Sequence, residues 1–328
     1  MFYNLFLKIF LILNLTLFSI YSLFINDLMM MWFFMEINNF MYICLLCLKI
    51  FNKKMIFLYF LIQTSSSLIM IFTIMLNFYF FEFLYFKLIL MTALSMKLGI
   101  PPFHMWMPLI SKFMNWDSLL ILLSIQKLTP LYMISTLEIP YFIMFLLIMM
   151  ASYLSTFKMM NLLNFKLIIT FSSINQTSWM LLLMLFKNLF WLFYFILYSS
   201  ILSMIHITFL YLKFSSNFMI NISNYNIQLM MISLFFNLSG LPPFSFFFMK
   251  WMSMYMFLFN SNHFLIFILM LLNSFILIYI YLNISLHLMF FFSITSKLIM
   301  MNPFKMFLWK ITLMMMTSLF SSLIMIMM

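Results

Sequence analysis

The chain has 328 residues, of which 67% are hydrophobic and 6% are charged, and its formal net charge is +11. A soluble domain carries about 25% charged residues, so this composition excludes a soluble globular protein and predicts a membrane protein. The net charge comes mostly from lysines in the expected loops, and we therefore expect no nucleic-acid partner.

Apolar runs long enough to cross a bilayer follow one another along the chain, separated by short polar links. They predict an all-α polytopic membrane protein with about 11 transmembrane helices. The expected spans are residues 9–25, 28–48, 55–77, 88–107, 118–137, 141–156, 167–185, 190–212, 228–257, 264–290 and 307–326.

Loop charges predict the topology. Lysines gather in alternate loops, on the side that holds the N-terminus, whereas only Lys87 and Lys187 lie in the opposite loops. The first group comprises Lys8, Lys49, Lys53, Lys54, Lys112, Lys158, Lys166, Lys213, Lys297, Lys305 and Lys310. Residue usage, with 41 methionines and no arginine or valine, indicates an AT-rich organellar gene. The positive-inside rule then places the N-terminus on the matrix side and, after an odd number of spans, the C-terminus on the intermembrane-space side.

The chain contains two glycines, and both open the same phrase, Gly-x-Pro-Pro-Phe. Proline lacks the backbone N–H and frees a carbonyl four residues earlier, so each phrase predicts a broken helix. The residues concerned are Gly99, Pro101, Pro102, Gly240, Pro242 and Pro243. Paired broken helices indicate an antiporter-like internal repeat within one transmembrane domain. We expect that domain to cover 1–328, with a first half of about 1–139, a second half of about 140–290 and a final helix of about 306–328.

Four charged residues lie within the expected spans: Glu36, Lys97, Lys127 and Lys250. A charge inside a membrane is costly and usually functional, and these four are the candidate proton relay. A simpler alternative for Glu36 is a hydrogen bond that joins two helices, with Asn39 one turn away as its partner. The alternative for Lys250 is a position near the membrane interface.

Pro130 follows Lys127 by three residues and frees the carbonyl of Gln126, so we expect a further helix break there. Weaker candidates for the relay or for lining water are His104, His206, Gln63, Ser173 and Gln176. Any of them could equally make a helix–helix hydrogen bond, which contributes less than about 2 kcal/mol.

Cys44 and Cys47 lie three residues apart in an apolar span, without a second cysteine pair. We interpret them as apolar-facing thiols. No His, Cys or carboxylate cluster has metal-ligand spacing, so no metal site and no cofactor are expected in this chain.

The segment Lys97-Leu-Gly-Ile-Pro-Pro-Phe-His-Met-Trp-Met-Pro108 resembles the signature of the antiporter-like subunits of proton-pumping NADH:ubiquinone oxidoreductase (respiratory complex I). Gln126-Lys127-Leu-Thr-Pro130, Gly240-Leu-Pro-Pro, Lys250-Trp251 and Glu36-Ile-Asn are similar to motifs of the chain 2 family among these subunits. The resemblance implies that Glu36 and Lys97 form an acid–lysine pair, that Lys127 is the central relay residue and that Lys250 lies on the exit side.

The resemblance also implies a subunit of the H⁺-translocating enzyme in the mitochondrial inner membrane. Its partners would be lipids and the other membrane-arm subunits, including neighbouring antiporter-like chains. NADH, FMN, iron–sulfur clusters and ubiquinone would be used elsewhere in the complex. Two alternatives are a scaffold subunit that joins neighbouring pump modules and a stand-alone cation/proton antiporter of the same fold.

Three positions depart from the family pattern. Leu109 stands where an acidic residue is usual, Gln176 where a histidine is usual, and Asn283 where a basic residue is expected. These departures bear on loop contacts and on the role of the histidine, but they leave the four membrane charges intact.

Overall fold

A computed structural model describes residues 2–49, 52–79, 85–137, 139–162, 164–185, 189–211, 225–242, 244–259 and 264–295. The secondary structure of these residues is helical, with turns between the helices. They confirm the all-α fold. The chain divides into two compact units, 1–151 and 152–328, and the expected boundary near residue 139 stays a prediction.

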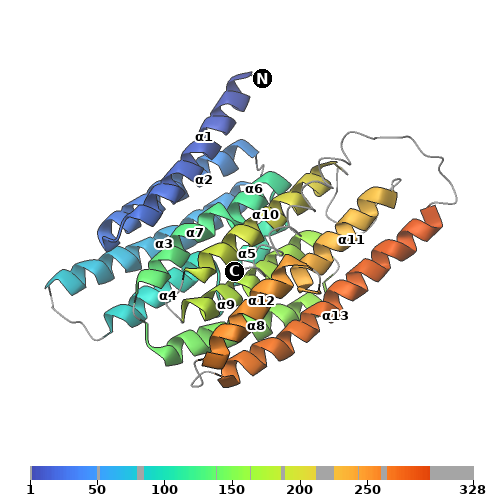
Figure 1. The fold of residues 1–328 in the computed structure, drawn as a ribbon. Helices are drawn as coiled ribbons and strands as arrows, with labels where there is room; N and C mark the ends of the chain where they lie inside the picture. The colour runs from blue at the N-terminus through green and yellow to red at the C-terminus, as the bar shows by residue number, and fades with distance from the viewer. Residues whose placement is uncertain are drawn as a thin grey trace. The chain divides into compact units, whose positions relative to one another are not determined.

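The first unit contains the helices that carry Glu36, Lys97 and Lys127. They are α1 (Phe2–Tyr21), the 3₁₀ turn η1 (Ser22–Phe24), α2 (Leu28–Lys49), α3 (Lys53–Tyr79), α4 (Phe86–Leu98), α5 (Trp106–Ser111), α6 (Trp116–Leu123), α7 (Ile125–Thr136) and the start of α8 (Tyr141–Met160). Helix α1 packs along α2, and α3 packs along both α2 and α4 (Figure 1). Helix α7 packs against α2 and α4, so the three charged helices are neighbours.

The second unit contains the end of α8 and the helices around Lys250. They are α9 (Phe165–Met184), α10 (Phe190–Tyr211), α11 (Tyr225–Ser239), α12 (Ser245–Phe259) and α13 (Phe264–Thr295). Helix α11 runs beside α13 and also packs against α10 and α12 (Figure 1). Every α9 side chain except that of Lys166 is buried, although the helix carries a run of polar residues from Ser172 to Ser178. A helix buried on all sides in this way is the centre of its unit.

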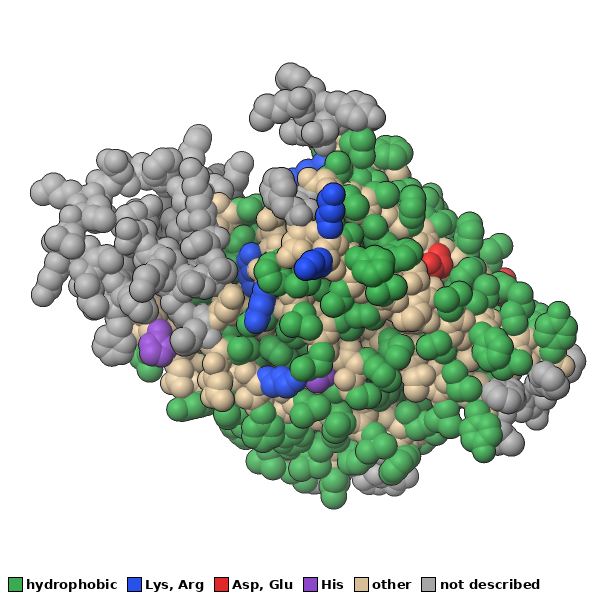
Figure 2. Space-filling view, turned by 180° about the vertical axis from the view of Figure 1, so that it is seen from behind, with side chains coloured by type: hydrophobic (Ala, Val, Ile, Leu, Met, Phe, Trp, Pro, Cys, Tyr) green, Lys and Arg blue, Asp and Glu red, His purple; other side chains and the backbone are tan. Residues whose placement is uncertain are grey.

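Eight of the expected spans coincide with stretches that are long and apolar enough to cross a membrane. Two more, 88–107 and 228–257, fall on interrupted helices, and 307–326 lies outside the described residues. Hydrophobic side chains cover most of the face shown in Figure 2. Large apolar residues such as Leu13 on α1 and Phe275 on α13 point outward, as lipid-facing residues do.

The break expected at Pro130 is wrong in position, because Pro130 lies inside α7. The interruption is at Ser124, between α6 and α7, where φ is −111° and ψ is −83°. The Ser124 hydroxyl and the Ser124 N–H both donate to the Leu120 carbonyl, at 2.7 and 3.0 Å. The backbone angles of Ser124 lie outside the helical region, and they separate α6 from α7.

Candidate proton-relay site

The first broken helix ends at a glycine in the left-handed conformation. Gly99 has φ 67° and ψ 37° and follows Leu98, the last residue of α4. Its N–H donates to the Met96 carbonyl at 3.3 Å, and the next N–H, of Ile100, donates to the Ser95 carbonyl at 3.0 Å. These two bonds form a Schellman motif, which needs a residue that tolerates positive φ.

The second broken helix ends in the same way. Gly240 has φ 77°, its N–H donates to the Asn237 carbonyl at 3.0 Å, and the Leu241 N–H donates to the Phe236 carbonyl at 3.3 Å. The two expected breaks are therefore confirmed, and a glycine cap makes the turn in each. Prolines after the cap cannot continue a helix. Pro242 lies in the described turn, and Pro243 lies outside the described residues.

Glu36 on α2 and Lys97 on α4 form an ion pair, with 3.3 Å between Oε1 and Nζ. The Lys97 side chain is 2% exposed and that of Glu36 is 30% exposed. The Asn39 amide donates to the same Glu36 oxygen at 3.5 Å, as the one-turn spacing on α2 suggested. An ammonium buried this deeply needs its counter-charge, because an isolated one would cost several kcal/mol.

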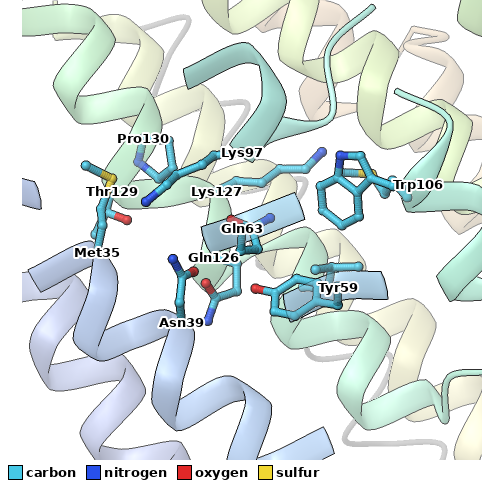
Figure 3. Close-up of a pocket in the computed structure, with 12 residues that line it drawn as sticks. Met35, Asn39, Tyr59, Gln63, Lys97, Trp106, Gln126, Lys127, Thr129 and Pro130 are labelled. Atoms are coloured by element: carbon cyan, nitrogen blue, oxygen red, sulfur yellow. The ribbon is translucent and has the colours of Figure 1, made fainter. Parts of the chain in front are cut away.

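Lys97 and Lys127 line one small polar cavity, which Figure 3 shows. The space open to the centre of a water molecule is about 10 Å³, enough for roughly one water. Gln63 and Gln126 line it as well, and the Gln126 amide donates to the Asn38 carbonyl at 3.2 Å. Amide side chains can orient a water molecule but do not titrate, and the two lysines are the basic groups of this lining.

Two further lining residues were not among the sequence candidates. Tyr59 lies one turn before Gln63 on α3, is fully buried and contacts Trp106 edge-on. Trp106 directs its indole N–H to the Met96 carbonyl at the end of α4, at 3.1 Å. The i, i+4 spacing of Tyr59 and Gln63 was a readable signal, because such residues share one helix face.

Lys250 on α12 is buried at the end of the second broken helix. Its ammonium donates to the Ser239 carbonyl at 2.8 Å and lies 5.5 Å from the centre of the Trp179 ring. Ser239 is the last residue of α11, so the cation lies at a helix C-terminus, where the helix dipole favours positive charge. Because α11 ends at Ser239, this carbonyl has no helical N–H partner, and the ammonium takes that place.

Gln176 on α9 binds the adjacent free carbonyl. Its amide N–H donates to the Leu238 carbonyl at 3.1 Å, and its amide oxygen accepts a hydrogen bond from the Tyr194 hydroxyl on α10. Pro242 is four residues after Leu238 and cannot supply the helical N–H. Gln176 therefore satisfies the end of the broken helix, which supports a structural role beside Lys250.

The remaining sequence candidates are one serine and two histidines. Ser173 is buried, and its hydroxyl donates to the Thr170 carbonyl within α9 at 2.6 Å. His104 is buried just after the first break, and His206 is half-buried on α10. Neither histidine lines the cavity that contains Lys97 and Lys127.

A buried polar network that the sequence did not indicate joins three helices of the second unit. The Thr156 hydroxyl on α8 donates to Asn273 Oδ1 on α13 at 2.8 Å, and the Asn273 amide donates to Asn175 Oδ1 on α9 at 3.2 Å. All three side chains are buried and non-titrating. Their hydrogen bonds fix α9 relative to its neighbours.

Within the described ranges, no group of three or more His, Cys, Asp or Glu residues could hold a metal ion. Cys44 and Cys47 are free thiols on α2, the first half-buried and the second exposed. Lys8, which belongs to the larger group of loop lysines, forms an ion pair with Asp117 at 2.9 Å.

Comparison with known proteins gives consistent relatives in sequence and in fold. No family model matches the chain. The chain is 35% identical over 247 residues to NADH-ubiquinone oxidoreductase chain 2 of Rhipicephalus sanguineus, covering 74% of this chain and 77% of the relative. It is 32% identical over 230 residues to the protein of the same name from Artemia franciscana, covering 69% and 72%.

Among solved structures, a chain of respiratory complex I from Thermus thermophilus, with bound aureothin, aligns with a TM-score of 0.81 at 16% identity. The alignment covers 97% of this chain and 78% of the other. A chain of the Mrp complex from Dietzia sp. aligns with a TM-score of 0.74 at 14% identity, covering 84% and 59%. At these identities the likeness is one of fold.

Proposed function

Because this chain belongs to the NADH-ubiquinone oxidoreductase chain 2 family, we propose that it translocates protons as a membrane-arm subunit of mitochondrial respiratory complex I. The observation that carries the proposal is the placement of Glu36, Lys97 and Lys127. Glu36 and Lys97 form an ion pair, and Lys97 also borders a water-sized polar cavity that it shares with Lys127. In this proposal the neighbouring membrane-arm subunits are its partners, and the electron carriers NADH, FMN, iron–sulfur clusters and ubiquinone act in other chains.

The ion pair is the element through which charge elsewhere in the complex acts on the relay. While Glu36 lies 3.3 Å from Lys97, each charge stabilises the other. Separating the two side chains removes that stabilisation and changes the proton affinity of both. Lys97 can then release its proton into the cavity, whose volume suits a single bridging water molecule.

Lys127 receives the proton from that water in this scheme, after it has passed its own proton on and become a neutral amine. Both lysines border the cavity, so the transfer needs no large motion of the helices. The relay continues to Lys250 in the second unit, whose ammonium, held on the Ser239 carbonyl, must release its proton before it can take up the next. A carbonyl accepts a hydrogen bond but does not take the proton, so Lys250 keeps its proton until another acceptor reaches it.

Proton translocation by the assembled complex in sealed vesicles tests the proposal. Lys250→Met removes the titrating group with little change of volume, and we expect proton translocation to fall. NADH-driven electron transfer by the peripheral subunits is measured in parallel. Lys54→Met, which changes an exposed lysine in the first turn of α3, is the matched control. Native translocation in Lys250→Met would support the scaffold alternative, in which none of the four charges carries a proton.

A further inference from the structure

The end of the Lys250 side chain occupies the space that a side chain at position 240 would fill. A Cβ atom built on Gly240 would lie 2.7 Å from Lys250 Nζ, 3.1 Å from Cε and 3.3 Å from Cδ. Carbon does not approach a nitrogen or carbon atom that closely without displacing it. The Lys250 ammonium therefore depends on the absence of a side chain at this position.

Gly99 provides an internal comparison, because it makes the same helix cap in the first unit. Its φ is 67°, against 77° for Gly240, and both caps have the same pair of hydrogen bonds. A Cβ on Gly99 would meet Met107 Cε at 2.9 Å and a Trp106 ring carbon at 3.4 Å. The backbone needs glycine in both places, but only at Gly240 does the open space hold an ammonium.

We propose that Gly240 is a positioning residue for Lys250: its missing side chain opens the space in which the ammonium binds the Ser239 carbonyl. The inference rests on the proposed role of Lys250 in translocation. It gives the second Gly-x-Pro-Pro-Phe phrase a function beyond breaking the helix. The glycine admits the cation, and the end of α11 at its cap leaves the Ser239 carbonyl without a helical partner, so that the ammonium can bind it.

The atoms that a Cβ would meet belong to the distal half of a long, flexible side chain rather than to backbone. A substitution at 240 is therefore expected to displace the ammonium while the ends of α11 and α12 stay in place. Proton transfer is sensitive to such displacement, because donor and acceptor must lie within about 3.5 Å. Moving the ammonium off Ser239 also removes a hydrogen bond that favours its charged form.

The test compares Gly240→Ala with Gly99→Ala in the complete complex. Both variants place alanine at a positive φ, so Gly99→Ala controls for backbone strain and assembly. In a density map of Gly240→Ala, we expect Lys250 Nζ to have left the Ser239 carbonyl, whereas in Gly99→Ala it should remain bound at the native 2.8 Å. Gly240→Asn, which tolerates the left-handed conformation better, replaces Gly240→Ala if the latter fails to assemble.

The second measurement is the rate of proton translocation as a function of pH, normalised to assembled complex. For Gly240→Ala we expect a loss of about 100-fold, the cost that an ångström of misplacement can carry. We also expect a shifted pH profile. A purely structural role would lower the rate equally at every pH. Lys250 still bound to Ser239 in Gly240→Ala would overturn the positioning inference, whatever the rate. A displaced Lys250 with native translocation would support positioning and overturn the proposed relay instead.

Discussion

Glu36 Oε1 lies 3.3 Å from Lys97 Nζ, although the two residues come from different helices and are 61 positions apart in the chain. The pair joins an uninterrupted helix, α2, to the last turn of a broken one, α4. The lysine is almost fully buried while the carboxylate is partly open. The charge of Lys97 is therefore fixed in place, and Glu36 is the partner that can be reached from outside the unit.

Removing the carboxylate charge should destabilise the first unit. Glu36→Gln keeps the shape of the side chain but leaves the Lys97 ammonium without its counter-charge. Breaking a buried pair costs about 3–5 kcal/mol, and we expect about 2 kcal/mol here because Glu36 is partly exposed. Lys97→Met combined with Glu36→Gln should cost less than the sum of the single changes. The coupling is the difference between the stability loss of the double variant and the sum of the two single losses, measured by thermal unfolding of the assembled complex. A double loss equal to that sum would contradict a functional ion pair.

Topology can be tested by tags on the expected loops. A tag beside Lys53 and Lys54 should be reached from the matrix side, and a tag after residue 328 from the intermembrane-space side. The lysine distribution is the physical reason. Protease protection in intact and opened mitochondria reads out both tags. If the protease reaches both tags from the same side of the membrane, the chain has one span fewer than expected.

The glycine cap, rather than the prolines alone, should maintain the first helix break. In Pro101→Ala/Pro102→Ala the Gly99 cap is intact, and we expect α4 still to end at Leu98. Adding Gly99→Ala removes the left-handed cap, and alanine favours the helix over glycine by about 1 kcal/mol. The triple variant should therefore extend α4 and lose translocation. A continuous helix in the double variant, seen in a density map, would show that the prolines alone make the break.

Gln176 should be needed for the stability of the second broken helix. Gln176→Leu leaves the Leu238 carbonyl and the Tyr194 hydroxyl without their observed partner. An unsatisfied buried group costs about 1–3 kcal/mol, so we expect a loss of about 3 kcal/mol. Gln176→His, which can donate one N–H, should lose less. Chemical unfolding compares the stability of the two variants. Equal losses of stability would contradict a role for the hydrogen bond to the Leu238 carbonyl.

Much of the fold follows from local signals in the sequence. Apolar spans are recognised by length and composition alone, and the repeated Gly-x-Pro-Pro-Phe phrase identifies the two broken helices. The break expected at Pro130 lies instead at Ser124, six residues earlier, and Pro130 stays inside α7. Proline is tolerated inside membrane helices, so its position alone does not fix where a helix is interrupted.

The candidate site was predictable where its residues are charged. Glu36, Lys97 and Lys127 stand out in apolar spans, and the structure brings these three together. Tyr59 and Asn273 were missed because a single tyrosine or asparagine in a span is ordinary. Their importance comes from residues on other helices. Tyr59 lines the cavity with them, and Asn273 accepts a hydrogen bond from Thr156. The i, i+4 spacing of Tyr59 and Gln63 is readable from the sequence, but no single-sequence pattern pairs Asn273 with Thr156.

Proton translocation by variants at Lys127 tests the central claim most directly. The Lys127 side chain is buried, with the residue 2% exposed, and it borders the cavity that it shares with Lys97. Lys127→Met keeps length and apolar volume but removes the titrating group. Lys127→Arg keeps the charge, and its guanidinium cannot release a proton at any accessible pH. Both variants should lose translocation in sealed vesicles, normalised to assembled complex and compared with Lys54→Met. Near-native translocation in both would contradict the relay and leave the chain a scaffold.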